Sequence, residues 1–201
     1  MLKRFTPIIT VVALCWVVFL INNLLWGGQL SHYGVIPRRA GGLPGILWAP
    51  FLHGSFKHLL ANTAPLLILG GIICARSKSE CSAVMAAGIL LSGGLTWLCA
   101  RTASHIGASG LVFCLFGYLA SLAYFRRTMG TLLLSALCIL GYGGMLRGIL
   151  PGSTTISWES HVAGLVAGIA CAWAAARIAP RSRKNLSTTA PEAPRAIDQI
   201  R

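Results

Sequence analysis

Apolar residues gather into six long runs along this chain, separated by shorter polar or glycine-rich segments. The runs cover residues 7–26, 58–75, 81–100, 109–126, 131–149 and 157–178. A helix needs about 20 mostly apolar residues to cross the hydrocarbon core of a bilayer, and each run is close to that length. The pattern therefore predicts an all-α polytopic membrane protein with six transmembrane helices.

Two segments do not fit this pattern. Residues 27–57 are too polar and too rich in glycine and proline to cross a bilayer, but they include Tyr33 and Trp48. Because aromatic side chains favour the headgroup level, we expect this first loop to lie in the membrane interface. Residues 179–201 are polar and lack a periodic apolar face, so we expect a flexible, basic cytoplasmic tail there.

Composition supports the membrane assignment and changes the meaning of the charge. The chain is 55% hydrophobic and only 10% charged, with a mean hydropathy of +0.72, which leaves too few charges to cover a water-soluble globule. A net charge of +13 would suggest a nucleic-acid partner in a soluble protein. In a membrane protein the positions of the basic residues instead predict orientation, and we expect no nucleic-acid partner.

The basic residues are distributed unequally between the two sides of the predicted bundle. With both termini in the cytoplasm, twelve lie inside (Lys3, Arg4, Arg76, Lys78, Arg126, Arg127, Arg177, Arg181, Arg183, Lys184, Arg195 and Arg201) and five outside (Arg38, Arg39, Lys57, Arg101 and Arg147). This excess agrees with the positive-inside rule, so both termini are predicted to be cytoplasmic.

The first apolar run follows Lys3 and Arg4, as the core of a secretory signal would. It has no A-x-A cleavage pattern, however, and five further runs follow it. The sequence thus predicts a retained first transmembrane helix.

The seven cysteines show no metal-site or disulfide spacing. They stand at positions 15, 74, 81, 99, 114, 138 and 171, without a CxxC pair, in or at the ends of apolar runs. Cysteines in such places are usually small packing residues, so we expect neither a disulfide framework nor a metal site.

Polar residues cluster where the second, fourth and sixth runs begin. HGSFKHLLAN supplies His53, His58 and Asn62, GASG supplies Ser109, and SWESHVAGLVAG supplies His161. Even-numbered helices all start on the same side of a membrane, so these groups are predicted to lie at similar depth in one layer. Polar groups at membrane depth are costly and are therefore functional candidates.

Taken singly, these residues have simpler explanations. A serine in a membrane helix usually bonds its own backbone, and a histidine at the end of a span is often interfacial, as we expect for His32 and His105. Together, however, they suit nucleophilic catalysis, because a serine hydroxyl needs a base to take its proton and histidine has a suitable pKa. The pattern predicts Ser109 as the nucleophile and His161 as the general base.

The acidic residues limit the mechanism. They are Glu80, Glu159, Glu192 and Asp198, and all except Glu159 fall on the predicted cytoplasmic side. Glu159 stands two residues before His161, so on a helix its side chain points away from the base. A Ser-His dyad without a carboxylate is the economical interpretation.

Three motifs together carry a family resemblance: the H-x4-H-x3-N spacing in HGSFKHLLAN, the G-x-S-G box in GASG, and the histidine followed by glycines at +3 and +7 in HVAGLVAG. With them the chain resembles the rhomboid family of intramembrane serine proteases, in its compact six-helix bacterial type. The resemblance implies a six-helix domain over residues 1–178 with a membrane-embedded first loop.

The resemblance also implies roles for individual residues. Ser109 and His161 would be catalytic. A second group would bind the oxyanion and substrate: His58, Asn62, Gly107 and Ala108. A third would be structural: His53, Gly110, Phe113, Gly164 and Gly168. It further implies no cofactor, a bacterial inner-membrane location, and single-span membrane proteins as substrates, cut near the outer face.

The sequence departs from the family pattern in two places. A Trp-Arg pair often found in the first loop is missing, with Pro37, Arg38 and Arg39 the nearest basic feature, and Phe113 stands where a tyrosine can stack on the base. Neither change removes a catalytic group. The oligomeric state and the identity of the substrate stay open.

Two other classes of protein compete with a protease. An inactive rhomboid-like scaffold that binds membrane helices should lack Ser109 or His161, and both are present. A small transporter or channel typically places paired charges or broken helices near the midplane of repeated halves, and the sequence shows no internal repeat.

Overall fold

The structure, a computed structural model, describes residues 2–152 and 156–178. Within these residues six helical segments are long and apolar enough to cross a membrane. They are α1 (Thr6–Leu25), the composite Phe56–Arg76, α5 (Lys78–Cys99), α6 (Ser109–Arg126), the composite Met129–Ile149, and α8 (Trp158–Ile178). The predicted all-α bundle is confirmed, while the expected tail, 179–201, lies outside the described residues.

Two spans change helix type along their length. The second consists of α3 (Phe56–Pro65), a π-helical turn η5 (Leu66–Gly70) and α4 (Gly71–Arg76). Pro65 cannot donate a backbone hydrogen bond, and the wider turn after it accommodates this loss. The fifth consists of α7 (Met129–Tyr142) and the 3₁₀ helix η6 (Gly143–Ile149), where a single regular helix was expected.

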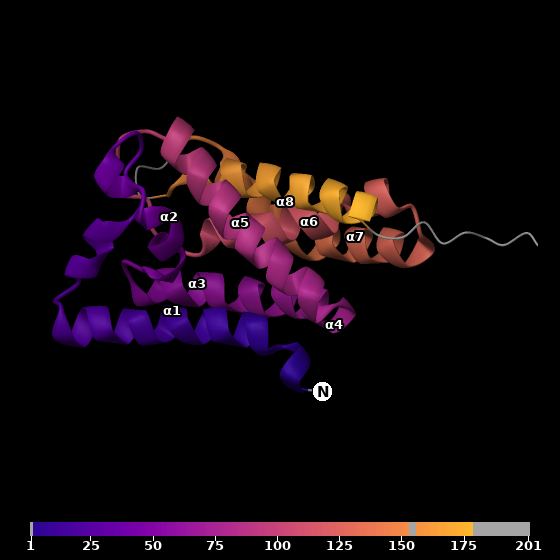
Figure 1. Cartoon of the computed structure of the whole chain (residues 1–201), viewed down its shortest axis with the longest axis horizontal. Coiled ribbons are helices and arrows are strands. Elements are labelled where there is room, and N and C mark those ends of the chain that lie inside the picture. Colours follow the sequence, from indigo (N-terminus) through magenta and orange to yellow (C-terminus); the bar gives the residue numbers. More distant parts are fainter. Residues whose placement is uncertain (1, 153–155, 179–201) are drawn as a thin grey trace, which may run out of the picture.

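The helix α6 forms the centre of the bundle. Every residue from Gly110 to Leu119 is buried, and α5, α7 and α8 pack around it (Figure 1). By contrast, α7 exposes Leu133, Leu137 and Leu140 on its outer face. Exposed aliphatic side chains of this kind suit helices that face lipid rather than water.

Glycines bring α8 into direct backbone contact with α6. A Cβ atom at Gly164 would overlap the carbonyl oxygen of Gly110, and one at Gly168 would overlap that of Cys114. On the other helix, a Cβ at Gly117 would lie 2.7 Å from the Leu165 carbonyl oxygen. Small residues permit this close approach of membrane helices, and they fix the start of α8 against the start of α6.

The segment between α1 and α3 folds as short helices: η2 (Gln29–Tyr33), η3 (Ala40–Gly42), α2 (Gly45–Trp48) and η4 (Ala49–Phe51). A three-residue helix, η1 (Leu2–Arg4), precedes α1. In Figure 1 the chain's N-terminus and the end of α8 lie at one end of the bundle, and the segment between α1 and α3 lies at the other.

This first loop is tied to the connection between α5 and α6. Val35 and His105 exchange two backbone hydrogen bonds, each 2.9 Å long. The Arg38 guanidinium donates to the carbonyl oxygens of Ala100 (2.7 Å) and Leu98 (3.3 Å). Arg38 thus anchors the loop in a chain that lacks the Trp-Arg pair.

One expectation, about two of the cysteines, is wrong. Cys74 and Cys81, taken as packing residues, form a disulfide between α4 and α5. The helix break at Ser77 brings their side chains together, which the spacing alone does not reveal. His105, which we expect at the membrane interface, is buried within the protein, where Val35 of the first loop pairs with it.

Candidate active site

Ser109 is the first residue of α6 and follows a tight turn. Gly107 has a φ of +107°, a conformation that side-chain-bearing residues rarely adopt, and its N–H donates to the Ala49 carbonyl at 2.8 Å. The first N–H groups of a helix have no intrahelical acceptors and carry its positive dipole end. The Ser109 hydroxyl therefore lies beside backbone donors suited to a developing negative charge.

The ring of His58 lies directly against this turn. A Cβ atom at Gly107 would be 2.5 Å from His58 Cε1 and 2.6 Å from Nε2. Glycine is therefore required at position 107 by both the backbone conformation and the imidazole. His58 lies on α3, so the turn before Ser109 is enclosed by the second span.

His53 and Asn62 support the turn before Ser109 through hydrogen bonds. His53 Nδ1 lies 3.3 Å from the Phe51 carbonyl, so its Nε2 can accept from the Asn62 amide at 3.2 Å and, weakly, from the Ala108 N–H at 3.5 Å. Burial, followed by the nearby charge of His58, lowers the pKa of His53 to about 4. His53 is consequently neutral at pH 7, which allows Nε2 to act as this acceptor.

Both N–H groups of the Asn62 amide are engaged within the protein. Besides facing His53, the amide donates to the His58 carbonyl oxygen at 3.1 Å. Asn62 would have to release one of these partners before donating to a substrate.

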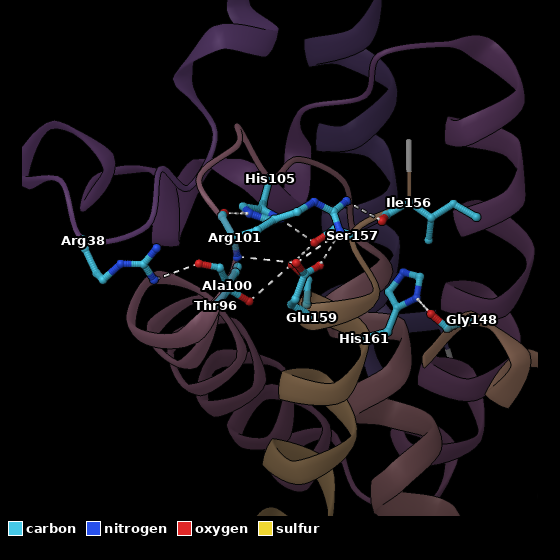
Figure 2. A network of polar contacts seen from close by, with 11 residues as sticks. Arg38, Thr96, Ala100, Arg101, His105, Gly148, Ile156, Ser157, Glu159 and His161 are labelled. Carbon is cyan, nitrogen blue, oxygen red and sulfur yellow. Dashed lines mark hydrogen bonds and ion pairs between the residues drawn. The ribbon is translucent and has the colours of Figure 1, made fainter. Parts of the chain in front are cut away.

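The imidazole of His161 is held on two sides. Its Nδ1 lies 2.8 Å from the Gly148 carbonyl oxygen, as Figure 2 shows, and the Phe113 ring stacks on it with centroids 4.3 Å apart and planes 12° apart. Because Nδ1–H donates to Gly148, Nε2 carries the lone pair and can accept a proton. A backbone carbonyl thus takes the place that a carboxylate has in a catalytic triad.

Gly148 is a site residue that the sequence analysis missed. It contributes only a main-chain oxygen, which has no signature in the sequence. A Cβ atom there would lie 3.0 Å from His161 Nδ1, so a larger residue would press on the ring.

The structure places Ser109 and His161 on the facing first turns of α6 and α8. A Cβ at Gly110, next to Ser109, would lie 3.4 Å from the carbonyl oxygen of Ser160, next to His161. Within the residues that the structure describes, no hydrogen bond joins the Ser109 hydroxyl to His161. Such bonds are often long in enzymes without substrate and shorten when it binds.

A second polar cluster surrounds the start of α8. The Arg101 guanidinium contacts both oxygens of Glu159, at 3.1 and 3.2 Å, and donates to the Ile156 carbonyl at 2.9 Å. His105 Nδ1 lies 2.5 Å from the Ser157 hydroxyl. The sequence motifs do not include Arg101, which stands in the loop before the GASG box.

A small cavity adjoins the turn. Its volume is about 30 Å³, enough for a water molecule, and its polar lining includes Ser92, Thr96, His105 and Ser160. It also borders Gly107 and Gly110, which stand on either side of the candidate nucleophile in the sequence.

Comparisons with known proteins give a consistent result. A family model described as "Rhomboid domain" matches residues 41–178. An uncharacterized protein of Mycobacterium tuberculosis is 36% identical over 177 residues, which are 84% of this chain and 73% of the relative. An uncharacterized protein of Mycobacterium leprae is 34% identical over 175 residues, 83% of this chain and 69% of the relative.

Proposed function

This chain belongs to the rhomboid family of integral multi-pass membrane proteins, and on that premise we propose that it is an intramembrane serine endopeptidase with Ser109 and His161 as its catalytic dyad. The observation that carries the proposal is the restraint on His161. Its ring is fixed by Gly148 and Phe113, with Nε2 left as a proton acceptor.

The chemistry is acyl transfer to serine followed by hydrolysis. His161 Nε2 takes the Ser109 proton as Oγ attacks the scissile carbonyl carbon, and it then gives that proton to the leaving amine as the C–N bond breaks. In the second half, His161 deprotonates a water that attacks the acyl-enzyme, and Ser109 leaves with its proton restored. The polar cavity beside Gly107 could hold such a water.

The tetrahedral intermediate needs donors for its oxyanion. The backbone N–H of Ser109 and the ring of His58, which lies against Gly107, are the donors that we assign first. The Asn62 amide is assigned a smaller part, since both its N–H groups already have acceptors.

The substrates assigned to this site are single-span membrane proteins, cut near the outer face of the bacterial inner membrane. A peptide bond inside a helix is shielded by its own hydrogen bonds, so a substrate helix that unwinds readily would be preferred. The first loop and the starts of the even-numbered helices would lie on that outer side, with both termini in the cytoplasm.

Active-site labelling tests the proposed nucleophile. The purified protein should react with a serine-directed fluorophosphonate, and the Ser109→Ala variant should not. Ser121→Ala is a matched control, because Ser121 lies on the same helix and its hydroxyl bonds the backbone carbonyls of Gly117 and Tyr118 in the preceding turn. A folded wild-type protein that stays unlabelled would favour the inactive scaffold instead.

Orientation is tested separately on intact cells. In a variant cleared of other cysteines, a cysteine in the first loop (residues 27–57) should react with an impermeant thiol reagent, and one after Arg181 only after permeabilisation. The Cys74–Cys81 pair gives a second measurement, since cytoplasmic thiol systems should keep it reduced in cells. A reactive tail with a silent loop would invert the topology and the side of product release.

A further inference from the structure

The nucleophile and the base of the proposed dyad belong to different helices, so their relative position depends on what joins those helices near the site. Glycine packing sets the distance between α6 and α8 along their length. It does not restrain the segment that enters α8, which follows residues outside the described range. Polar contacts at the start of α8 supply this missing restraint.

The first of these contacts is made by Arg101. Its Nη1 reaches both carboxylate oxygens of Glu159, and its Nη2 donates to the Ile156 carbonyl, so one guanidinium holds the segment before α8 and the first turn of α8 together. The Glu159 side chain is 9% exposed, against 37% for Arg101. A largely buried carboxylate with a charged partner gives a directional, charge-assisted contact.

The second contact is made by His105, four residues further along the same connection. Its Nε2 lies 2.9 Å from the Arg101 carbonyl oxygen, so Nε2–H donates there and Nδ1 accepts from the Ser157 hydroxyl. The Ser157 carbonyl in turn accepts the backbone N–H of His161 at 3.3 Å. His105 thus links the chain leading to Ser109 with the helix turn that carries His161.

We infer that Arg101, His105, Ser157 and Glu159 form a clamp that positions the His161 imidazole relative to Ser109. The inference rests on the proposed function and adds positioning residues to it. The clamp joins the connection that ends in the GASG box to the first turn of α8, as Figure 2 shows. Glu159 does not act as a third triad member, because its carboxylate is directed to Arg101 and the Nδ1 of His161 is taken by Gly148.

The chain offers a matched control at the other end of the bundle. Arg126 and Glu80 also form an ion pair, with Nη2 and Oε2 2.8 Å apart, between α6 and α5. Glu80→Gln removes one carboxylate charge from an ion pair, as Glu159→Gln does. Only the second change touches the clamp.

Kinetics with a helix-bearing reporter in liposomes tests the inference. Glu159→Gln should lower kcat by about 10- to 100-fold with KM nearly unchanged, because a displacement of the base by about 1 Å affects the chemical step and not substrate binding. The fluorophosphonate labelling rate should fall in parallel. Glu80→Gln should keep kcat and the labelling rate within about 2-fold of wild type, although its melting temperature falls.

Two more variants separate positioning from folding. The exchanged pair, Arg101→Glu with Glu159→Arg, should recover part of the kcat lost by either single change. If Glu159→Gln does not purify as a folded protein, Ser157→Ala removes a single hydroxyl from the clamp and should still lower kcat several-fold.

The possible results distinguish the two proposals. A wild-type protein that neither cleaves nor labels would refute the proposed function, and the clamp with it. An active wild type with Glu159→Gln at wild-type kcat would overturn the clamp alone. Equal losses of kcat in Glu159→Gln and Glu80→Gln would also overturn it, because the effect would then reflect general helix packing.

Discussion

An ion pair lies at each end of the helix bundle, and the two differ in what they join. The Arg101–Glu159 pair lies in a loop and a helix start, and its guanidinium also bonds a backbone carbonyl. Its contacts therefore fix main-chain segments that lead to Ser109 and His161. Changes at this end should affect the rate of the proposed reaction before they affect stability.

The opposite end is built from side chains on regular helices. Glu80 accepts from Arg126 and from the hydroxyl of Tyr118, whose side chain is fully buried. Cys74 and Cys81 pair between α4 and α5 at the same end. These contacts hold α4, α5 and α6 together without reaching a loop of the site, so changes here should affect stability and leave the rate unaltered.

The largest loss of activity is expected when His161, the proposed general base, is removed. His161→Ala should lower reporter cleavage by about 10⁴-fold or more, the scale of removing a catalytic base from a serine protease. The variant should fold, because α8 keeps its glycine contacts with α6. Cleavage in liposomes and thermal melting measure the two properties, and robust cleavage by folded His161→Ala would refute the dyad.

A methyl group between α6 and α8 should have the next largest effect. Gly164→Ala would place its Cβ against the carbonyl oxygen of Gly110, beside Ser109, and backbone cannot yield as a side chain can. We expect kcat to fall about 100-fold, through displacement of His161, and stability to fall by about 2 kcal/mol. Kinetics in liposomes and thermal melting in detergent measure the two losses.

Gly94→Ala is the control for that substitution. Gly94 lies on α5, where a Cβ would meet nothing within 4 Å, so stability should be unchanged or slightly higher. Similar activity losses in both variants would mean that helix glycines matter for a reason other than the α6–α8 contact.

The oxyanion donors should show a graded effect. His58→Ala should lower kcat by about 100-fold, on the scale of one lost donor, with the ring beside Gly107 removed. Asn62→Ala should lower it by only about 10-fold, because its amide is occupied by His53 and the His58 carbonyl. Rates of the purified variants at saturating substrate give the two kcat values. A larger loss of kcat for Asn62→Ala than for His58→Ala would make Asn62 the main oxyanion donor.

Much of this arrangement could be predicted from the sequence, for a simple reason. Six apolar runs of membrane-spanning length give the bundle, and the parity of the helices brings the starts of α3, α6 and α8 to one side. Ser109 and His161 are thus brought into the same layer before any contact is known.

The parts that the sequence could not reveal depend on main-chain geometry. Gly148 acts through its carbonyl oxygen, which every residue has. Arg101 becomes part of the site only because the connection after α5 turns toward α8. His105 is buried through its pairing with Val35, which is seventy residues earlier in the sequence, and its position at the end of a span does not reveal this contact.

The smallest effect on activity is expected at the ion pair of Arg126 and Glu80. Glu80→Gln leaves the Arg126 charge without its carboxylate and leaves a single neutral amide oxygen where two carboxylate oxygens accepted from Tyr118 and Arg126, so stability should fall by about 2 kcal/mol. Arg126 Nε is already buried without a partner in the described part of the chain, which increases its dependence on Glu80. Because this pair lies where α5 begins and α6 ends, far from the site, kcat below the melting temperature should stay within about 2-fold of wild type. Thermal melting in detergent and kinetics in liposomes measure the two properties. A fall in kcat without a fall in melting temperature would mean that the Glu80 end also controls the site, and the distinction between the two ends would fail.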